Sequence, residues 1–269
     1  MLDSESLYSE SYGEGDPILF LHGLGANGFS WKQLVPYLEK KHKLILLDLK
    51  GFGESPKPFD DKYSMRDHAD CVLKFIKKNN LKNLIIAGNS FGGAIGLVVA
   101  QELQSKNEIP KGLILIDSVA YRQELPWFVE LMKIPLLGLL SLGLPAGSFI
   151  RKCIGDCFYN QKKIPESTIK EVLKDFSHWR TRYALRQTAK GMPPVNLVEF
   201  ENGIKDITIP TLIIWGKEDK IIPLILGKRL HKEIKKSEMV IFENCGHVPQ
   251  EEMPKETAEA ILQFLEKQS

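Results

Sequence analysis

Several features of secreted, zinc-binding and nucleic-acid-binding proteins are missing from this chain of 269 residues. Its four cysteines form no CxxC pair and show no zinc-ligand spacing. The 36 Lys and Arg residues against 34 Asp and Glu residues give a net charge of +2, which does not indicate a nucleic-acid partner. The polar N-terminus, MLDSESLYSESYGEGD, lacks the basic and apolar regions of a signal peptide, so we expect reduced thiols and a cytoplasmic location.

Long hydrophobic runs are also scarce. The most apolar stretch, residues 131–150, is interrupted by Pro135 and Pro145, whereas a membrane-spanning helix needs about 20 predominantly apolar residues. We therefore expect no stable membrane insertion and interpret this stretch as a lid or a buried helix. A composition of 43% hydrophobic and 26% charged residues is typical of a globular protein with one large domain or a domain with an insertion.

Short apolar runs alternate with amphipathic segments along the chain. The runs predicted to be strands are PILFLHG (17–23), KLILLD (43–48), NLIIAG (83–88), GLILID (112–117), PTLIIWG (210–216) and EMVIF (238–242). They are apolar throughout, which is typical of parallel strands covered on both faces. Helices are predicted after Ser64, which has capping-box spacing to Asp67, and from Pro254. The alternation predicts an α/β protein with a doubly wound, mostly parallel sheet.

The alternation stops after Asp117 and resumes at Ile209. The residues between follow a helical pattern and are rich in Lys, Arg and Pro. We interpret residues 121–207 as an inserted α-helical cap. Residues 1–120 and 208–269 then form one core, because the sheet needs strands from both sides of the insertion.

The segment GNSFGG (88–93) places a serine between a predicted strand and a predicted helix. Such a G-x-S-x-G turn forces the serine into a strained conformation that exposes its hydroxyl. Side chains at Gly88 and Gly92 would collide across the turn, and Gly93 would let the helix approach the sheet. An ordinary tight turn would also use glycines, but the flanking strand and helix favour Ser90 as a nucleophile.

A nucleophilic serine needs a base, and the base needs an acid that orients it. Asp219 in IIWGKED and His247 in ENCGHVPQEE both follow predicted strands, and function collects at the carboxyl ends of parallel strands. A turn aspartate and a solvated loop histidine are the ordinary alternatives. The chain order Ser, Asp, His favours a triad. Asp117, which ends another strand, is a rival for the acid.

The chain resembles the α/β-hydrolase fold superfamily over nearly its whole length. The matching segments are LHGLGAN (21–27), DLKGFGES (48–55), GNSFGG (88–93), WGKEDKIIP (215–223) and CGHVPQEE (245–252). The resemblance implies Ser90 as nucleophile, His247 as general base and then acid, and Asp219 as its orienting acid, although some members carry the acid where Asp117 stands. No metal or organic cofactor is needed by this mechanism.

The oxyanion that forms when serine attacks a carbonyl needs preorganised hydrogen-bond donors. The backbone N–H of Phe91, at the start of a helix, is one candidate, because the helix dipole favours negative charge there. The resemblance assigns the second donor to the backbone N–H of Leu24.

Serine at this turn argues against epoxide hydrolases and haloalkane dehalogenases, which look similar but place an aspartate there. We favour a carboxylesterase of a small, apolar substrate. The alternative is a C–C bond hydrolase, since GNSFGG is similar to the turn of meta-cleavage-product hydrolases. Those enzymes commonly carry an aromatic residue where Val248 stands. They also use a cap arginine, for which Arg180, Arg182 and Arg186 are candidates, although a solvated basic helix face explains the three arginines equally well. A non-catalytic small-molecule binding protein is the third interpretation.

The apolar stretch also supplies candidates for substrate contact. If the insertion covers the strand ends, Leu136, Leu139 and Leu140 are predicted to line an acyl pocket, with Val248 next to the histidine. Alternatively, these leucines pack within the insertion or against the sheet and never touch substrate.

Overall fold

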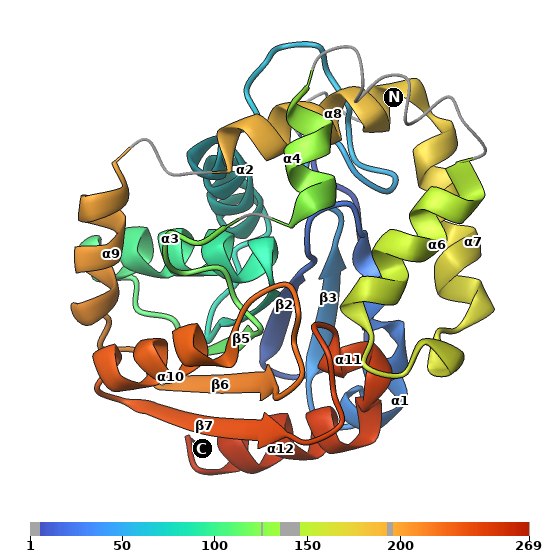
Figure 1. Cartoon of the computed structure of the whole chain (residues 1–269). Helices are drawn as coiled ribbons and strands as arrows, with labels where there is room; N and C mark the ends of the chain where they lie inside the picture. The colour runs from blue at the N-terminus through green and yellow to red at the C-terminus, as the bar shows by residue number, and fades with distance from the viewer. Residues whose placement is uncertain (1–5, 125, 135–145, 193–195, 269) are drawn as a thin grey trace.

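The computed structural model describes residues 6–124, 126–134, 146–192 and 196–268. In this part of the chain, seven strands form one sheet in the order β1-β3-β2-β4-β5-β6-β7 (Figure 1). The strands are β1 (Ser9–Tyr12), β2 (Pro17–Leu21), β3 (Lys43–Leu47), β4 (Ile85–Asn89), β5 (Gly112–Ile116), β6 (Thr211–Gly216) and β7 (Ser237–Phe242). All six predicted strands are confirmed, and their neighbouring pairs are parallel.

The strand that sequence analysis missed is β1, which pairs antiparallel with β3 at the edge of the sheet. Its sequence, SESY, has no fully buried side chain. Backbone hydrogen bonds rather than an apolar pattern therefore define this strand.

Helices cover both faces of the sheet. The helices outside the insertion are α1 (Val35–Leu38), α2 (Met65–Lys78), α3 (Phe91–Ser105), α10 (Leu224–Glu233), α11 (Pro249–Glu252) and α12 (Pro254–Glu266), with a 3₁₀ helix at Gly28–Leu34. The predicted starts of α2 and α12 are confirmed. At α2, Ser64 N donates to Asp67 Oδ2 (2.9 Å) and Asp67 N donates to Ser64 Oγ (3.2 Å), so the capping box forms with Asp as its second member.

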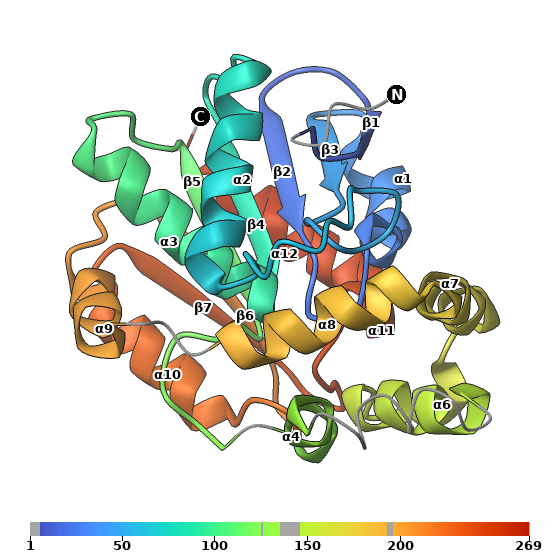
Figure 2. The same cartoon turned by 90° about the horizontal axis from the view of Figure 1, so that it is seen from above.

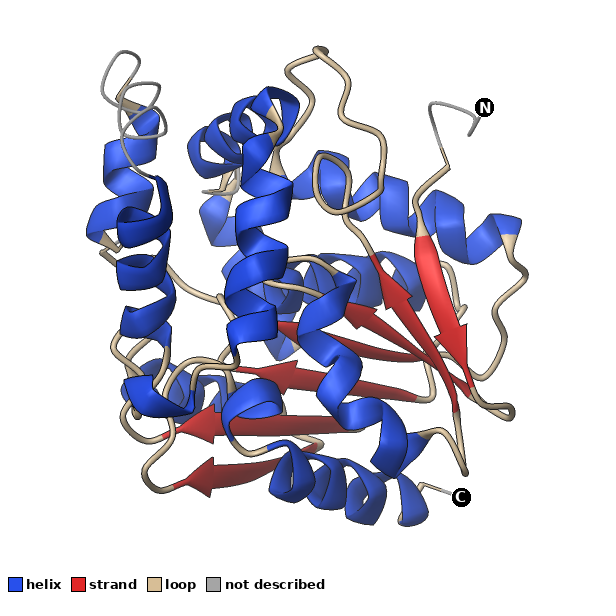
Figure 3. Cartoon of the chain, turned by 90° about the vertical axis from the view of Figure 1, so that its right-hand side faces the viewer, coloured by secondary structure: helices blue, strands red, loops and turns tan. Residues whose placement is uncertain are grey.

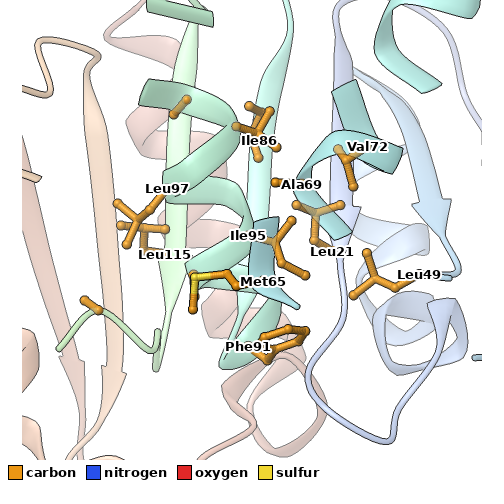
Figure 4. Close-up of a cluster of buried hydrophobic side chains, with 14 of the residues drawn as sticks. Leu21, Leu49, Met65, Ala69, Val72, Ile86, Phe91, Ile95, Leu97 and Leu115 are labelled. Atoms are coloured by element: carbon orange, nitrogen blue, oxygen red, sulfur yellow. The ribbon is translucent and has the colours of Figure 1, made fainter. Parts of the chain in front are cut away.

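Consecutive strand residues pack on opposite layers of helices. Leu19 and Leu21 of β2 pack in the cluster that contains residues of α2 and α3 (Figure 4). Ile18 and Phe20 pack in a second cluster that contains residues of α1 and α12. Figure 2 shows α2 and α3 on one side of the strands and α12 on the other. Each fully buried side chain of this size contributes roughly 1.5–3 kcal/mol, so the two-sided burial stabilises the parallel sheet.

The described residues between β5 and β6 form helices joined by loops and contain no strand. The helices are α4 (Trp127–Lys133), α6 (Ala146–Cys157), α7 (Glu166–Ser177), α8 (Trp179–Gly191) and α9 (Leu197–Lys205), with a short 3₁₀ helix at Gln161–Lys163. The parallel strands point toward α4, α6, α7 and α8, and α9 returns beside α10 (Figures 1 and 3). The carboxyl ends of the strands therefore face the inserted helices.

A search of the described residues finds no helix with the length and apolar character required to cross a membrane. The apolar stretch 131–150 contributes the end of α4 and the start of α6. Residues 135–145 within it lie outside the described residues.

Candidate active site

Ser90 lies at the turn between β4 and α3 with φ 56° and ψ −119°. A non-glycine residue in this backbone conformation costs about 1–3 kcal/mol of conformational energy. The conformation persists only because the surrounding structure fixes it. A Cβ added to Gly88 would lie 2.4 Å from the Gly92 oxygen, and one added to Gly92 would lie 2.1 Å from the Leu21 oxygen. At Gly93 the added Cβ would lie 2.2 Å from a side chain of the loop after β5. The collision across the turn predicted at Gly88 is confirmed, whereas Gly92 closely approaches the end of β2 and Gly93 the loop after β5.

The loops after β6 and β7 bring Asp219 and His247 together in the protein interior. Nδ1 of His247 donates to Oδ2 of Asp219 at 2.8 Å, because a carboxylate can only accept. This tautomer leaves the lone pair of Nε2 free. Oδ1 of Asp219 accepts from the N–H groups of Ile221 (2.7 Å) and Ile222 (3.1 Å), so the carboxylate is held on both oxygens. Asp219 and His247 are only 9% and 5% exposed.

Asn89, the residue before Ser90, connects three strand ends. Its Nδ2 donates to the Ile116 oxygen at the end of β5 (3.1 Å) and to the His247 oxygen (3.0 Å). The side chain therefore fixes the histidine loop relative to the serine turn. Sequence analysis missed this residue because the G-x-S-x-G pattern leaves its position open.

Asp117 lies beside Asp219, fully buried, at the end of β5. Its Oδ1 accepts from Gly216 N (3.0 Å), and its Oδ2 has no partner among the described residues. Burial and the neighbouring Asp219 raise the pKa of Asp117 well above its usual value. Burial therefore favours the protonated form of Asp117, and Asp219 is the member that binds His247.

Asp117, Asp219 and His247 also make up a cluster whose candidate metal-ligand atoms lie within 4.8 Å of one another. Nδ1 of His247 and both oxygens of Asp219 already take part in hydrogen bonds. The arrangement therefore suits an oriented imidazole better than a metal ion.

The two backbone groups predicted for oxyanion binding, the N–H groups of Phe91 and Leu24, donate no hydrogen bond within the described structure. The loop that carries Leu24 is fixed by His22, whose Nδ1 donates to the Gly23 oxygen (2.8 Å) and whose Nε2 accepts from Leu49 N (3.0 Å). Burial lowers the pKa of His22 to about 4, so it stays neutral and positions the loop.

Ser90 and His247 line one cavity of about 160 Å³. The inserted helices supply much of its wall from α6, α7 and α8, mostly with apolar side chains: Phe149, Ile150, Ile154, Val172, Phe176 and Leu185. The strand-end loops contribute Leu24 and Val248, two of the predicted site residues. The predicted substrate contacts Leu136, Leu139 and Leu140 lie outside the described residues.

The predicted arginines do not line this cavity. The Arg180 guanidinium lies over the rings of Phe59 (5.1 Å) and Trp179 (5.8 Å). Nε of Arg182 donates to the Phe176 oxygen at 2.7 Å. Aromatic stacking and a backbone contact account for Arg180 and Arg182. Arg186 does not line the cavity either, because the described lining residues include no Arg or Lys.

Two adjacent glutamates on α11 were also missed. Glu252 accepts from three backbone N–H groups, those of Tyr159 (3.0 Å), Asn160 (2.8 Å) and Gly246 (2.9 Å). His247 N donates nearby to the Cys157 oxygen (2.7 Å). These contacts join the end of α6 to the histidine loop, whereas Glu251 lines the cavity.

A family model described as the alpha/beta hydrolase fold matches residues 16–254. The chain belongs to this family. The match spans the serine turn, the loops that carry Asp219 and His247, and all the inserted helices.

Relatives of this chain include two bacterial hydrolases. A 2-hydroxy-6-oxo-6-(2'-aminophenyl)hexa-2,4-dienoic acid hydrolase of Metapseudomonas resinovorans is 28% identical over 98% of this chain and 89% of its own. Lipase 1 of Psychrobacter immobilis is 29% identical over 93% of this chain and 77% of its own. A solved structure of a serine hydrolase involved in carbazole degradation is 26% identical with a TM-score of 0.78, covering 97% of this chain and 94% of that one.

Proposed function

We propose that this chain is a serine hydrolase that cleaves carboxylic esters of small, uncharged substrates through an acyl-enzyme. The observation that carries the proposal is the buried hydrogen bond between His247 and Asp219 beside a cavity that Ser90 also lines. A strained serine turn, a free Nε2 on the imidazole and an acid on Nδ1 are the parts that serine acyl transfer requires.

In the acylation step, the Ser90 hydroxyl attacks the ester carbonyl while Nε2 of His247 takes its proton. The carboxylate of Asp219 holds Nδ1–H and stabilises the imidazolium that forms. The N–H groups of Phe91 and Leu24 receive the oxyanion, and each such donor contributes about 10²–10³ in kcat. His247 then gives its proton to the leaving alcohol.

Deacylation uses the same groups. Nε2 of His247 takes a proton from the water molecule that attacks the acyl carbonyl. It then gives this proton to Ser90 Oγ as the bond between Oγ and the acyl carbon breaks, which releases the carboxylic acid. We propose that the inserted helices of residues 121–207 act as a cap, because α6, α7 and α8 wall the cavity. Excluding water there strengthens the oxyanion contacts and shields the intermediate.

A C–C bond hydrolase is the second candidate, favoured by the dienoic acid hydrolase that is 28% identical to nearly the whole chain. A dienoic acid carries a carboxylate, which a cavity must neutralise. The described lining offers no Arg or Lys, has Val248 after the histidine and contains Glu251. These residues favour an uncharged ester.

Turnover of p-nitrophenyl esters tests the proposal. We expect Ser90→Ala to lower kcat by about 10⁴-fold or more, while Ser177→Ala, an exposed serine on α7, keeps wild-type activity. A fluorophosphonate should add one label to the wild type and to Ser177→Ala and none to Ser90→Ala. Equal labelling of wild type and Ser90→Ala would contradict the proposal, and saturable ester binding without turnover would instead favour a binding protein.

Acyl-chain length gives a second test of the same cavity. Each buried methylene contributes ~0.8 kcal/mol, or up to about fourfold in kcat/KM. We expect esters of medium acyl chains to be hydrolysed faster than acetate. Fastest turnover of acetate, with a steady decline for longer chains, would contradict an apolar acyl pocket.

A further inference from the structure

Glu251 introduces a carboxyl group into a cavity whose walls are otherwise mostly apolar. Glu251 and His247 are both residues of the described lining, four positions apart in sequence. Glu251 is the only acidic side chain of that lining, which holds no Arg or Lys. Burying a carboxylate there without a counter-ion costs free energy of folding, which suggests that Glu251 contributes to function.

The hydrogen bonding of Glu251 is incomplete. Its Oε2 accepts from Oγ1 of Thr168 on α7 at 2.7 Å, and Oε1 makes no hydrogen bond or ion pair with the described residues. The adjacent Glu252 differs, because three backbone N–H groups bind its two oxygens. Glu252 thus joins the loop after α6 to the histidine loop, whereas Oε1 of Glu251 is left to accept a hydrogen bond from a molecule in the cavity.

The other ionisable groups of the lining do not balance a negative charge at Glu251. Cys153 and Cys157 on α6 are free thiols, and burial raises the pKa of both, that of Cys153 to about 12, so they stay neutral. His247 is bound to Asp219. Burial raises the pKa of Glu251 itself to about 7, so the carboxyl group is mostly protonated well below pH 7 and is mostly an anion only from about pH 8.

Resting on the proposed ester hydrolysis at Ser90, we propose that Glu251 selects the substrate class: uncharged esters that carry a hydroxyl group, with carboxylate-bearing esters excluded. The hydroxyl donates to the unpaired oxygen of Glu251 while the apolar wall holds the rest of the chain. A substrate carboxylate would meet a like charge in a region of low dielectric.

Three esters that differ only at the end of the acyl chain test this role at pH 8: ethyl hexanoate, ethyl 6-hydroxyhexanoate and monoethyl adipate. A hydrogen bond to a charged group changes kcat/KM by roughly tenfold or more. We expect the wild type to favour the hydroxy ester over ethyl hexanoate by about that factor and to disfavour the adipate ester by at least as much. Hexyl acetate, 6-hydroxyhexyl acetate and 6-acetoxyhexanoate present the same groups on the alcohol side.

Two variants separate charge from hydrogen bonding. Glu251→Gln should restore turnover of the carboxylate esters by about tenfold, because it removes the charge and keeps an amide in place. Glu251→Leu should also abolish the preference for the hydroxy esters. Glu171→Gln removes the same charge from α7 outside this cavity and should leave all the ratios unchanged.

The outcomes separate the two proposals. Ratios in Glu251→Gln and Glu251→Leu equal to those of the wild type would overturn the role of Glu251 alone. Absence of turnover for every ester would contradict the proposed hydrolysis. Calorimetric binding of the same esters to Ser90→Ala, with and without Glu251→Gln, measures the selectivity without turnover and would overturn the role of Glu251 if the ratios coincide.

Discussion

Two hollows lie where the inserted helices meet the loops of the sheet, and different side chains line them. The first, of about 160 Å³, contains Ser90 and His247 among mostly apolar residues. The second, of about 320 Å³, is lined by charged and polar residues: Asn27, Glu54, Lys57, Glu171, Lys174, Asp175, His178 and Arg180. The larger and more polar hollow is therefore the one without the serine.

The charges of the polar hollow are engaged with one another. Nζ of Lys174 lies 3.2 Å from Glu54 and 3.7 Å from Glu171. Asp175 accepts from Gly53 N (2.9 Å), and Lys57 lies 4.0 Å away from its carboxylate. Such partly exposed pairs contribute little each, but they leave few free charges for an anionic ligand. The number of arginines in the insertion therefore says little about the substrate unless the partners of those arginines are known.

The sharpest test compares Asp219, which binds the cavity-lining His247, with the neighbouring buried Asp117. Asp219→Asn should lower kcat by about 10⁴-fold, because an amide in place of the orienting carboxylate of a Ser-His-Asp triad favours the wrong histidine tautomer. Asp117→Asn should cost less than about tenfold. Since burial raises the pKa of Asp117 and its Oδ1 already accepts from Gly216 N, the amide of an Asn resembles its protonated carboxyl group.

Steady-state kinetics on one p-nitrophenyl ester, with circular dichroism of both variants, make this comparison. A larger loss in Asp117→Asn than in Asp219→Asn would move the orienting acid to the end of β5.

The carboxyl group of Glu251 should make stability depend on pH. Its pKa is about 7 in the folded chain against 4.5 as the ordinary value, so between these values the folded state binds more protons than the unfolded state. The contribution of Glu251 to the free energy of unfolding is therefore fully present below pH 4.5. It falls by about 3 kcal/mol or less as pH rises through 7. Glu251→Gln should not show this loss.

Urea unfolding of wild type and Glu251→Gln at pH 5 and pH 8 measures the difference directly, because other titrating groups are common to both proteins. An identical pH dependence in the two proteins would show that Glu251 ionises normally in the folded state.

The smallest effect is expected in the polar hollow. Arg180→Ala removes the guanidinium that lies over Phe59 and Trp179. Exposed cation–π contacts are worth about 0.5–1 kcal/mol, so the variant should unfold slightly more easily while kcat/KM for uncharged esters changes by less than about twofold. A tenfold loss of kcat/KM, with KM raised for carboxylate esters, would make Arg180 a substrate contact after all.

The parallel part of the fold could be predicted because its strands are buried on both faces. Runs such as LIIA before Ser90 are apolar at every position. The start of the helix after Ser64 could be predicted because Ser64 and Asp67 have the spacing of a capping box. The edge strand β1 has no such pattern, because β3 binds its backbone by hydrogen bonds and its side chains are not fully buried.

The candidate site could be predicted where chemistry restricts the residue type, and less well where contacts depend on distant elements. Ser90, Asp219 and His247 each follow a strand, so the sheet topology alone brings them to one edge. Their catalytic roles remain predictions for the kinetic tests above. The roles of Asn89 and Glu251 depend on the histidine loop and on α7, which no local pattern encodes.

The contacts of Glu252 have a consequence for protein engineering. The hydrogen bonds from Tyr159 and Asn160, with the bond from His247 N to the Cys157 oxygen, tie the middle of the insertion to the histidine loop. The inserted helices therefore cannot be replaced as one unit without breaking these hydrogen bonds. A chimaera that takes its substrate wall from a relative should exchange the segments before residue 157 and after residue 160 separately and keep the native junction between them.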